Sequence, residues 1–390
     1  MILTGLDRLL KQFPKLLPGK RVGLLCHPAS INKKLFSAIE VLKAAHINVV
    51  RLFGPEHGLH GEAQDMEGVE SCEVKSLYGK DLASLRPKKE WLEDLDVLVV
   101  DLQDVGSRYY TFIYTMAFCM EVASLTQTQV CVLDRPNPIN GHHLEGNLIK
   151  PGYHSFVGAY NLPNRHGMTI GELAQFFNTE IASAGLPRND KKCELTVIPM
   201  KGWHRRRYFD ELDYPWVAPS PNMPTVDTAV VYPGMCLLEG TEISEGRGTT
   251  LPFQIFGAPF IDPQKLVNRL NEFRLPSVKF RPAFFKPQFQ KHAGVVCGGA
   301  QIHVTRRRSF LPLLTGMAVI KAIHDLWPKN FAWRVGAYEF VEDKPAIDLL
   351  MGGLEFREQI ERGATLKEMC AGFGEEIEKF KAVRKKYLLY

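Results

Sequence analysis

The sequence predicts an α/β protein, with a Rossmann-like and mostly parallel sheet domain followed by a smaller α+β domain. In the first 200 residues, short apolar runs alternate with segments of helical periodicity, which is typical of repeated βαβ units. That alternation stops after residue 260. The length of 390 residues is also more than one ordinary domain needs. We therefore expect a first domain over residues 1–260 and a second over residues 261–390.

Five apolar runs are expected to form the first sheet. In chain order they cover residues 21–26, 48–53, 96–100, 129–133 and 195–200. Between them, residues 35–45 and 109–124 carry apolar side chains at helical spacing. Thr169 followed by Glu172 is the pattern of a capping box at the start of a third helix.

The later part of the chain has mixed element types. Residues 225–238 are apolar enough for a buried helix, with Pro233 as a kink and Gly240 at its end. Residues 253–260 resemble a strand. Beyond residue 261 we expect a helix, two strands and then further helices, at residues 262–273, 278–285, 295–304 and from 310 onward.

Composition excludes several classes of protein. A hydrophobic content of 45% with 23% charged residues is globular, and a net charge of +5 with scattered basic residues predicts no nucleic-acid partner. The Arg triplets at 205–207 and 306–308 are expected to be solvated. No apolar stretch approaches the roughly 18 residues that span a bilayer, so we expect no membrane association. No secretory signal is visible, and the eight cysteines contain no CxxC pair, so we expect a cytoplasmic location. If the natural chain is longer and begins with a leader, we expect secretion instead.

The expected strands end in polar loops, and the second loop reads GPEHG. Ligands bind at the carboxyl ends of parallel strands, so these loops should form one site. Glu56 is our leading candidate for a general acid, because a carboxyl at the mouth of an apolar sheet can have a raised pKa. The alternative is that Glu56 caps the next turn or pairs with an arginine.

Further candidates follow the third and fourth strands. Asp101 and Asp104 are suited to hold sugar hydroxyls, although Asp104 could equally cap a helix. The loop over residues 135–167 is long enough to be functional, and Arg165 precedes a helix N-terminus, where an anion is favoured. Glu239 and Arg247 lie just before and within the glycine-rich segment 240–250. This segment is either a mobile lid or the source of a second carboxylate, or it is a flexible linker.

Familiar cofactor motifs are missing. No GxGxxG follows the first strand, and no P-loop, HExxH or GxSxG motif occurs. We therefore expect neither a dinucleotide nor any other cofactor, and no metal.

The segments GPEHGLHGEAQD, DLQDVGSRYYTFIYTM, DRPNPING, RHGMTIGEL, PSPNMPT and EGTEISEGRGTTLPF occur in this order. Together they resemble the exo-β-N-acetylmuramidase family, glycoside hydrolase family 171. The resemblance implies a Rossmann-like catalytic domain, a C-terminal auxiliary domain, and release of N-acetylmuramic acid from the non-reducing ends of peptidoglycan fragments. It also implies a catalytic glutamate, which corresponds to Glu56 here.

Glycoside hydrolysis usually needs two carboxyl groups. We expect Glu56 as the acid and Asp101, Asp104 or Glu239 as its partner, unless the 2-acetamido group of the sugar is the nucleophile. The lactyl carboxylate requires a cation, for which Arg108, Arg135, Arg165 and Arg247 are candidates. The full set expected to bind a saccharide or muropeptide is His27, His57, Gln103, Arg108, Tyr110, Asp134, Arg135, Asn137, Arg165, His166, Asn222 and Arg247.

Two other functions stay open. One is a metal-dependent amidase or deacetylase acting on wall fragments, because His27, Glu56, His57, His60 and Asp101 are metal-ligand types, although without a known spacing. The other is a non-catalytic protein that binds muropeptides.

Overall fold

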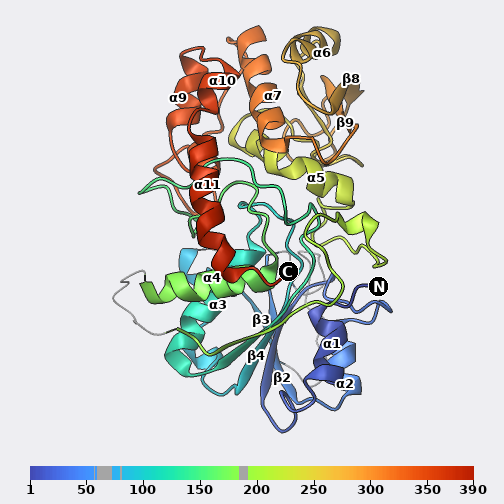
Figure 1. Ribbon diagram of the computed structural model, residues 1–390. Helices are drawn as coiled ribbons and strands as arrows, with labels where there is room; N and C mark the ends of the chain where they lie inside the picture. The colour runs from blue at the N-terminus through green and yellow to red at the C-terminus, as the bar shows by residue number, and fades with distance from the viewer. Residues whose placement is uncertain (57, 59–72, 80, 184–191) are drawn as a thin grey trace.

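We describe a computed structural model of the chain, covering residues 1–56, 58, 73–79, 81–183 and 192–390. The molecule consists of two stacked units (Figure 1). The first contains the parallel sheet near both chain ends, and the second contains an antiparallel sheet and most of the later helices. None of the helices within those described ranges is both long and apolar enough to cross a membrane.

The first sheet has the predicted α/β topology. Its strands are β1 (Val22–Cys26), β2 (Val49–Gly54), β3 (Glu73–Ser76), β4 (Val97–Asp101), β5 (Gln129–Leu133) and β6 (Leu195–Ile198). They lie in the order β3-β2-β1-β4-β5-β6, and every neighbouring pair is parallel. This is the strand order of a Rossmann sheet, with its topological switch point between β1 and β4. The predicted strands are confirmed within a few residues, and β3 is an edge strand that the sequence did not predict.

Helices cover both faces of this sheet. Helices α1 (Gly5–Gln12) and α2 (Ala38–Ala44) lie on one face, and α3 (Phe112–Thr126) and α4 (Ile170–Ser183) on the other (Figure 1). Successive residues of a strand point to opposite faces, so Leu24 joins the core under α1 and α2, whereas Leu25 joins the core under α3 and α4.

The predicted capping box at the start of α4 is confirmed. The Thr169 N–H donates to Glu172 Oε2 over 3.0 Å, and the Glu172 N–H donates to Thr169 Oγ1 over 3.3 Å. Short 3₁₀ turns complete the first unit at Leu82–Leu85, Lys89–Trp91 and Phe209–Glu211.

The second unit begins its regular structure with α5 (Val226–Met235), which contains Pro233 and continues into the 3₁₀ turn η4 (Cys236–Gly240). Three strands form an antiparallel sheet in the order β7-β9-β8. They are β7 (Ile255–Ala258), β8 (Val278–Phe285) and β9 (Cys297–Val304). The helices are α6 (Pro263–Glu272), α7 (Pro312–Leu326), α8 (Ala346–Met351), α9 (Glu355–Glu361), α10 (Leu366–Met369) and α11 (Phe373–Arg384), followed by a 3₁₀ turn over Lys385–Tyr387.

The boundary predicted after residue 260 falls between β7 and the two strands that share its sheet. Helix α5 also packs on α7. We propose that the second unit extends back to the start of α5.

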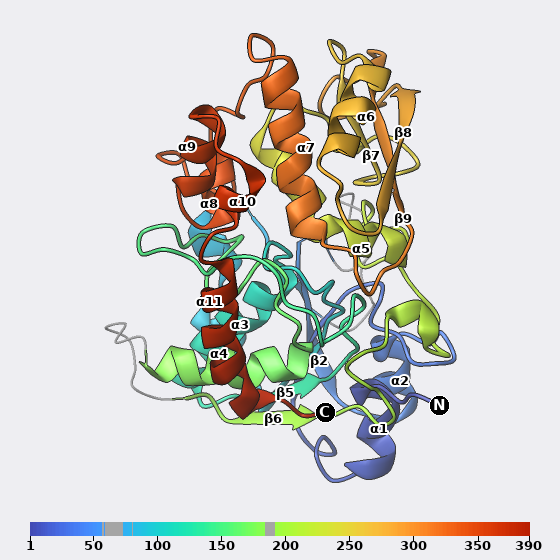
Figure 2. The ribbon, with the colours of Figure 1, turned by 45° about the horizontal axis from the view of Figure 1, so that its top comes forward.

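Helix α11 connects the two units. It leaves the second unit and runs back along the first, so that the C-terminus lies beside the parallel sheet (Figures 1 and 2). Arg384 Nη1 donates to the carbonyl oxygens of Gly141, over 3.1 Å, and Gly167, over 2.8 Å. The Tyr390 hydroxyl donates to buried Asp134 Oδ2 over 2.5 Å. These contacts fix the relative position of the two units, and therefore the shape of the space between them.

Candidate active site

A pocket lies where the two units meet, and the space between atoms there, which is partly open to solvent, measures about 470 Å³. The first unit contributes Glu56, Tyr109, Tyr110, Thr111, Val157, Ser220, Asn222 and Met223. The second unit contributes Tyr232, Glu239, Arg247, Phe253, Tyr338 and Glu339. Three carboxyl groups and one guanidinium therefore face one small cavity.

Glu56 reaches the pocket because the chain turns sharply after β2. The Gly58 N–H donates to the Pro55 oxygen over 2.9 Å, and Gly58 has a φ of 73°, which glycine adopts without strain. The Thr111 hydroxyl, just before α3, donates to Glu56 Oε2 over 2.6 Å. Thr111 is itself buried, so this bond fixes the direction in which the Glu56 carboxyl points.

Glu239 belongs to an ordered charge network. Arg247 Nη2 donates to Glu239 Oε1 over 2.5 Å, and the Tyr338 hydroxyl donates to Glu239 Oε2 over 2.9 Å. Glu245 lies 3.6 Å from Arg247 Nε and 3.0 Å from Lys291 Nζ. Burial alone would lower the pKa of Arg247, but Glu239 and Glu245 raise it above its ordinary value. The segment is thus held by ion pairs, and Arg247 remains charged.

Glu339 occupies a tight turn between α7 and α8. The Tyr338 and Val341 backbones exchange hydrogen bonds of 2.9 and 3.0 Å, which leaves Glu339 and Phe340 as the two central residues. Both have positive φ, 47° and 67°, as in a type I′ turn. Asparagine and glycine usually fill these positions, and such a backbone costs other residues about 1 kcal/mol or more.

The surroundings of Glu339 favour its neutral form. Burial, followed by the negative charges of Glu56 and Glu239, raises its pKa from 4.5 to about 7. Burial and the same kind of carboxylate repulsion, from Glu56 and Glu339, raise the pKa of Tyr78 well above its ordinary range. One carboxyl of the pocket can therefore keep a proton near neutral pH.

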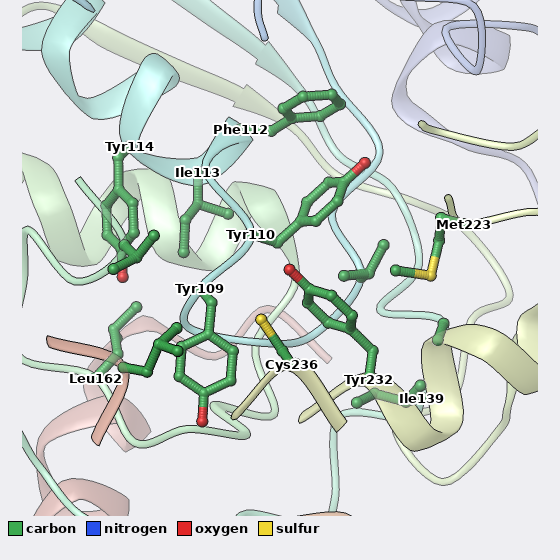
Figure 3. Packing of buried hydrophobic residues seen from close by; sticks show 14 of the residues in the cluster. Tyr109, Tyr110, Phe112, Ile113, Tyr114, Ile139, Leu162, Met223, Tyr232 and Cys236 are labelled. Carbon is green, nitrogen blue, oxygen red and sulfur yellow. The ribbon is translucent and has the colours of Figure 1, made fainter. Parts of the chain in front are cut away.

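Aromatic rings form one wall of the pocket. Tyr110 lies between Phe112 and Tyr232, with ring centroids 4.7 and 6.2 Å away (Figure 3). Tyr232 also meets Phe253 edge to face at 4.9 Å. Phenol rings of this kind present an apolar face and a hydroxyl to a sugar, so this wall suits a saccharide.

The switch point between β1 and β4 is filled by protein. Arg135 Nε and Nη2 donate to the two Asp101 oxygens over 2.5 and 2.7 Å, and both side chains are buried. His27 Nε2 accepts from the Gln103 N–H over 2.9 Å. The Gln103 amide donates to the carbonyls of Asp104 and Pro136. None of these predicted site residues lines the pocket.

The remaining predicted residues are also buried away from the pocket. Arg108 donates to the carbonyl oxygens of Asn147, Leu162 and Leu350 over 2.7–2.9 Å, so both of its terminal nitrogens are bonded inside the protein, whereas its Nε has no partner among the described residues. The other predicted residues that are buried and do not line the pocket are Asp104, Asp134, Asn137, Arg165 and His166. His57 and His60 lie outside the described residues.

The structure thus brings together Glu56, Tyr110, Asn222, Glu239 and Arg247 from the predicted set. The sequence analysis missed Thr111, Ser220, Tyr232, Tyr338 and Glu339. The turn around Glu339 follows no strand of the predicted sheet and carries no turn signal, so no local pattern marks it. Within the described part of the chain, no three His, Cys, Asp or Glu side chains are grouped to hold a metal ion.

Fold and site together define a two-unit α/β protein with a carboxyl-rich, aromatic-walled pocket between its units. Family models for the N-terminal and C-terminal parts of the exo-beta-N-acetylmuramidase NamZ match residues 22–227 and 230–390. The chain belongs to this family, as its motifs indicated. It is 45% identical to the peptidoglycan beta-N-acetylmuramidase NamZ of Bacillus subtilis (strain 168), over 99% of this chain and 91% of that protein.

Two solved structures share the whole architecture. Both are DUF1343 family proteins from Bacteroides fragilis NCTC 9343. One is 35% identical to this chain with a TM-score of 0.88, and the match covers 100% of this chain and 99% of that protein's chain. The other is 29% identical with a TM-score of 0.77, with the same coverage.

Proposed function

We propose that this protein is an exo-acting glycoside hydrolase that releases N-acetylmuramic acid from the non-reducing ends of peptidoglycan fragments. Membership of the NamZ family supports this activity. The observation that carries it is the meeting of Glu56 with two further glutamates in one small pocket between the units. Hydrolysis of a glycosidic bond usually needs two carboxyl groups that flank the bond.

Glu56 is the carboxyl that we place at the scissile bond from the first unit. Its bond from Thr111 holds it in one orientation before substrate arrives. A group held in this way loses little freedom in the transition state, which favours catalysis. Glu239 has one oxygen on Arg247 and the other on Tyr338, so we give it the role of positioning Arg247.

Arg247 is the cation that we propose for the lactyl carboxylate of the sugar. It is the arginine, among the four candidates from the sequence, that lines the pocket. A guanidinium carries five N–H donors, more than Glu239 and Glu245 require, and Arg binds carboxylates bidentately. Tyr110 and Tyr232 would pack on the ring, with Asn222 and Ser220 beside its hydroxyl and acetamido groups.

We also propose a cytoplasmic location, in which the substrate is an imported or recycled wall fragment. Buried thiols such as Cys119 and Cys131 support a reducing compartment.

Product analysis after incubation with the disaccharide of N-acetylmuramic acid and N-acetylglucosamine tests the reaction class. The disaccharide carries N-acetylmuramic acid at its non-reducing end. We expect both of its sugars to appear as free monosaccharides. Tight binding without release would indicate a binding protein. Release of acetate or of a peptide, lost with a chelator and restored by zinc, would indicate a metal-dependent deacetylase or amidase.

A further inference from the structure

We propose that a groove beside the active-site pocket binds the continuing glycan strand of a peptide-free peptidoglycan fragment, with Arg86 on the lactyl carboxylate of the next N-acetylmuramic acid. This inference rests on the proposed function, because it names the part of the substrate that extends beyond the released sugar. An exo-acting hydrolase holds the terminal sugar in its pocket, so the rest of the strand must lie outside it. N-acetylmuramic acid recurs at every second sugar of the strand, and its carboxylate recurs with it.

The groove lies next to the pocket because two tight turns contribute to both. In the turn over residues 155–158, whose ends exchange backbone hydrogen bonds of 3.3 and 3.0 Å, Phe156 lines the groove and Val157 lines the pocket. In the type I′ turn described above, Tyr338 lines the pocket and Val341 lines the groove. The space between atoms in the groove, which is partly open to solvent, measures about 1190 Å³. A strand that leaves the pocket therefore has a second, larger hollow beside it.

A row of aromatic rings connects the wall of the pocket to Arg86. The Tyr78 hydroxyl donates to Glu339 Oε2 over 3.4 Å, and the Tyr78 ring lies 6.1 Å from the ring of Phe156. Phe156 stacks on Phe118 of α3, with ring centroids 6.0 Å apart. The guanidinium of Arg86 lies 3.9 Å from the centroid of the Phe118 ring. Arg86 is thus three successive ring contacts away from the carboxyl groups of the pocket.

The Arg86 guanidinium is held in place and still has donors for a ligand. Its Nε donates to Glu121 Oε2 over 2.8 Å, and the other Glu121 oxygen accepts from the Tyr160 hydroxyl over 2.9 Å. Within the described ranges, neither terminal nitrogen of Arg86 has a hydrogen-bond partner, and its side chain is 36% exposed. Two N–H groups of one guanidinium match the two oxygens of a carboxylate. The groove therefore contains a preoriented cation for an anionic strand.

The other groups that line the groove suit an acetylated amino sugar. The Asn161 side chain accepts a backbone N–H over 2.9 Å through its oxygen, which leaves its amide nitrogen to donate. The Ser155 hydroxyl is buried and has no hydrogen-bond partner among the described residues. Leu82, which is half exposed, offers apolar surface to an acetyl methyl. Burial raises the pKa of Glu180, the second carboxyl of the groove, which weakens its repulsion of an anionic ligand.

The length and charge of the substrate separate this groove from the pocket. We would measure release of N-acetylmuramic acid from the disaccharide, from the peptide-free tetrasaccharide, and from a tetrasaccharide whose internal N-acetylmuramic acid is replaced by N-acetylglucosamine. For wild type, KM should be about tenfold lower for the natural tetrasaccharide than for the other two, because only that substrate brings a carboxylate to Arg86.

Arg86→Gln should lose this advantage. Its KM for the natural tetrasaccharide should rise about tenfold, whereas its KM for the other two substrates and its kcat on all three should change by about twofold or less. Lys88→Gln is the matched control and should behave as wild type. Lys88 also lies over a ring, 5.6 Å from the centroid of Trp91, but it does not line the groove.

Wild type gives an independent readout if Arg86→Gln does not fold, since the two tetrasaccharides differ only at the internal sugar. Equal wild-type KM values for these two substrates, or an equal rise for Arg86→Gln on all three, would overturn the inference. Tighter binding of a tetrasaccharide with a stem peptide on its internal lactyl group would show that the groove binds peptide instead. If wild type releases no sugar from any substrate, the proposed function fails, and calorimetric Kd values for the same glycans still test the groove.

Discussion

The crevice between β1 and β4 and the pocket between the two units both contain acidic and basic side chains, yet they differ in how those side chains are paired. In the crevice, Asp101 and Arg135 are buried and neutralise each other with two hydrogen bonds. In the pocket, Glu56 meets glutamates from another part of the chain, and burial together with the charges of Glu56 and Glu239 raises the pKa of Glu339 to about 7. Polar residues at strand ends therefore do not indicate a site where the protein buries them and pairs them with each other, as it does Asp101 and Arg135.

The largest effect should come from Glu56. We expect Glu56→Gln to lower kcat on the disaccharide by about 10³-fold or more, because the substitution removes a group that acts in the transition state. Tm should stay within a few degrees of wild type, since glutamine still accepts the Thr111 bond. Steady-state kinetics with a thermal melt check both. Activity near that of wild type would remove Glu56 from the catalytic role.

In the crevice between β1 and β4, we expect a substitution to lower the stability of the protein and to leave kcat almost unchanged. Asp101→Asn leaves the Arg135 guanidinium buried without a counter-ion, which should lower the free energy of unfolding by about 3–5 kcal/mol. Per folded molecule, kcat should change less than twofold, because neither residue lines the pocket. Urea denaturation and active-site-normalised kinetics measure the two quantities. A large loss of kcat in a variant as stable as wild type would place the chemistry at the switch point instead.

Arg247 should control recognition of the lactyl group. For Arg247→Gln, we expect the Kd for N-acetylmuramic acid to rise at least about tenfold, because a charge-assisted hydrogen bond contributes about 1.5–3 kcal/mol. The Kd for N-acetylglucosamine, which lacks the lactyl group, should change little. Calorimetric titration of both sugars makes the comparison. An equal weakening for both would show that Arg247 only supports the fold of the pocket.

The smallest effect should come from Thr111. Thr111→Val keeps the volume but removes the hydroxyl that donates to Glu56 Oε2. We expect a 2–10-fold lower kcat, corresponding to about 0.5–1.5 kcal/mol for one hydrogen bond, with little change in KM. Thr115→Val, one helical turn further on, is the matched control, since its hydroxyl donates to the Thr111 carbonyl over 3.4 Å and not to Glu56. Equal behaviour of the two variants would contradict the orienting role.

The sequence predicted the sheet well because periodicity and strand ends are local properties. The runs that became β1, β4 and β5 are continuous apolar segments, as buried parallel strands require. Strand β3, with the sequence EVKS, is short and polar, and only its pairing with β2 makes it a strand.

The site was less predictable for the same reason. Glu56 stands in a glycine-flanked motif after a strand, whereas Glu339 reaches the pocket only through packing of the second unit on the first. Arg108 and Arg135 carry the right charge for a ligand, but sequence does not show that backbone carbonyls and Asp101 already use it.

The most direct test of where the reaction takes place is a crystal structure of Glu56→Gln bound to the disaccharide. We predict density for N-acetylmuramic acid in the pocket between the units, with its lactyl carboxylate on Arg247 and its glycosidic oxygen beside residue 56. Density for the sugar at the β1–β4 crevice, against Gln103 and Asp101, would contradict the account.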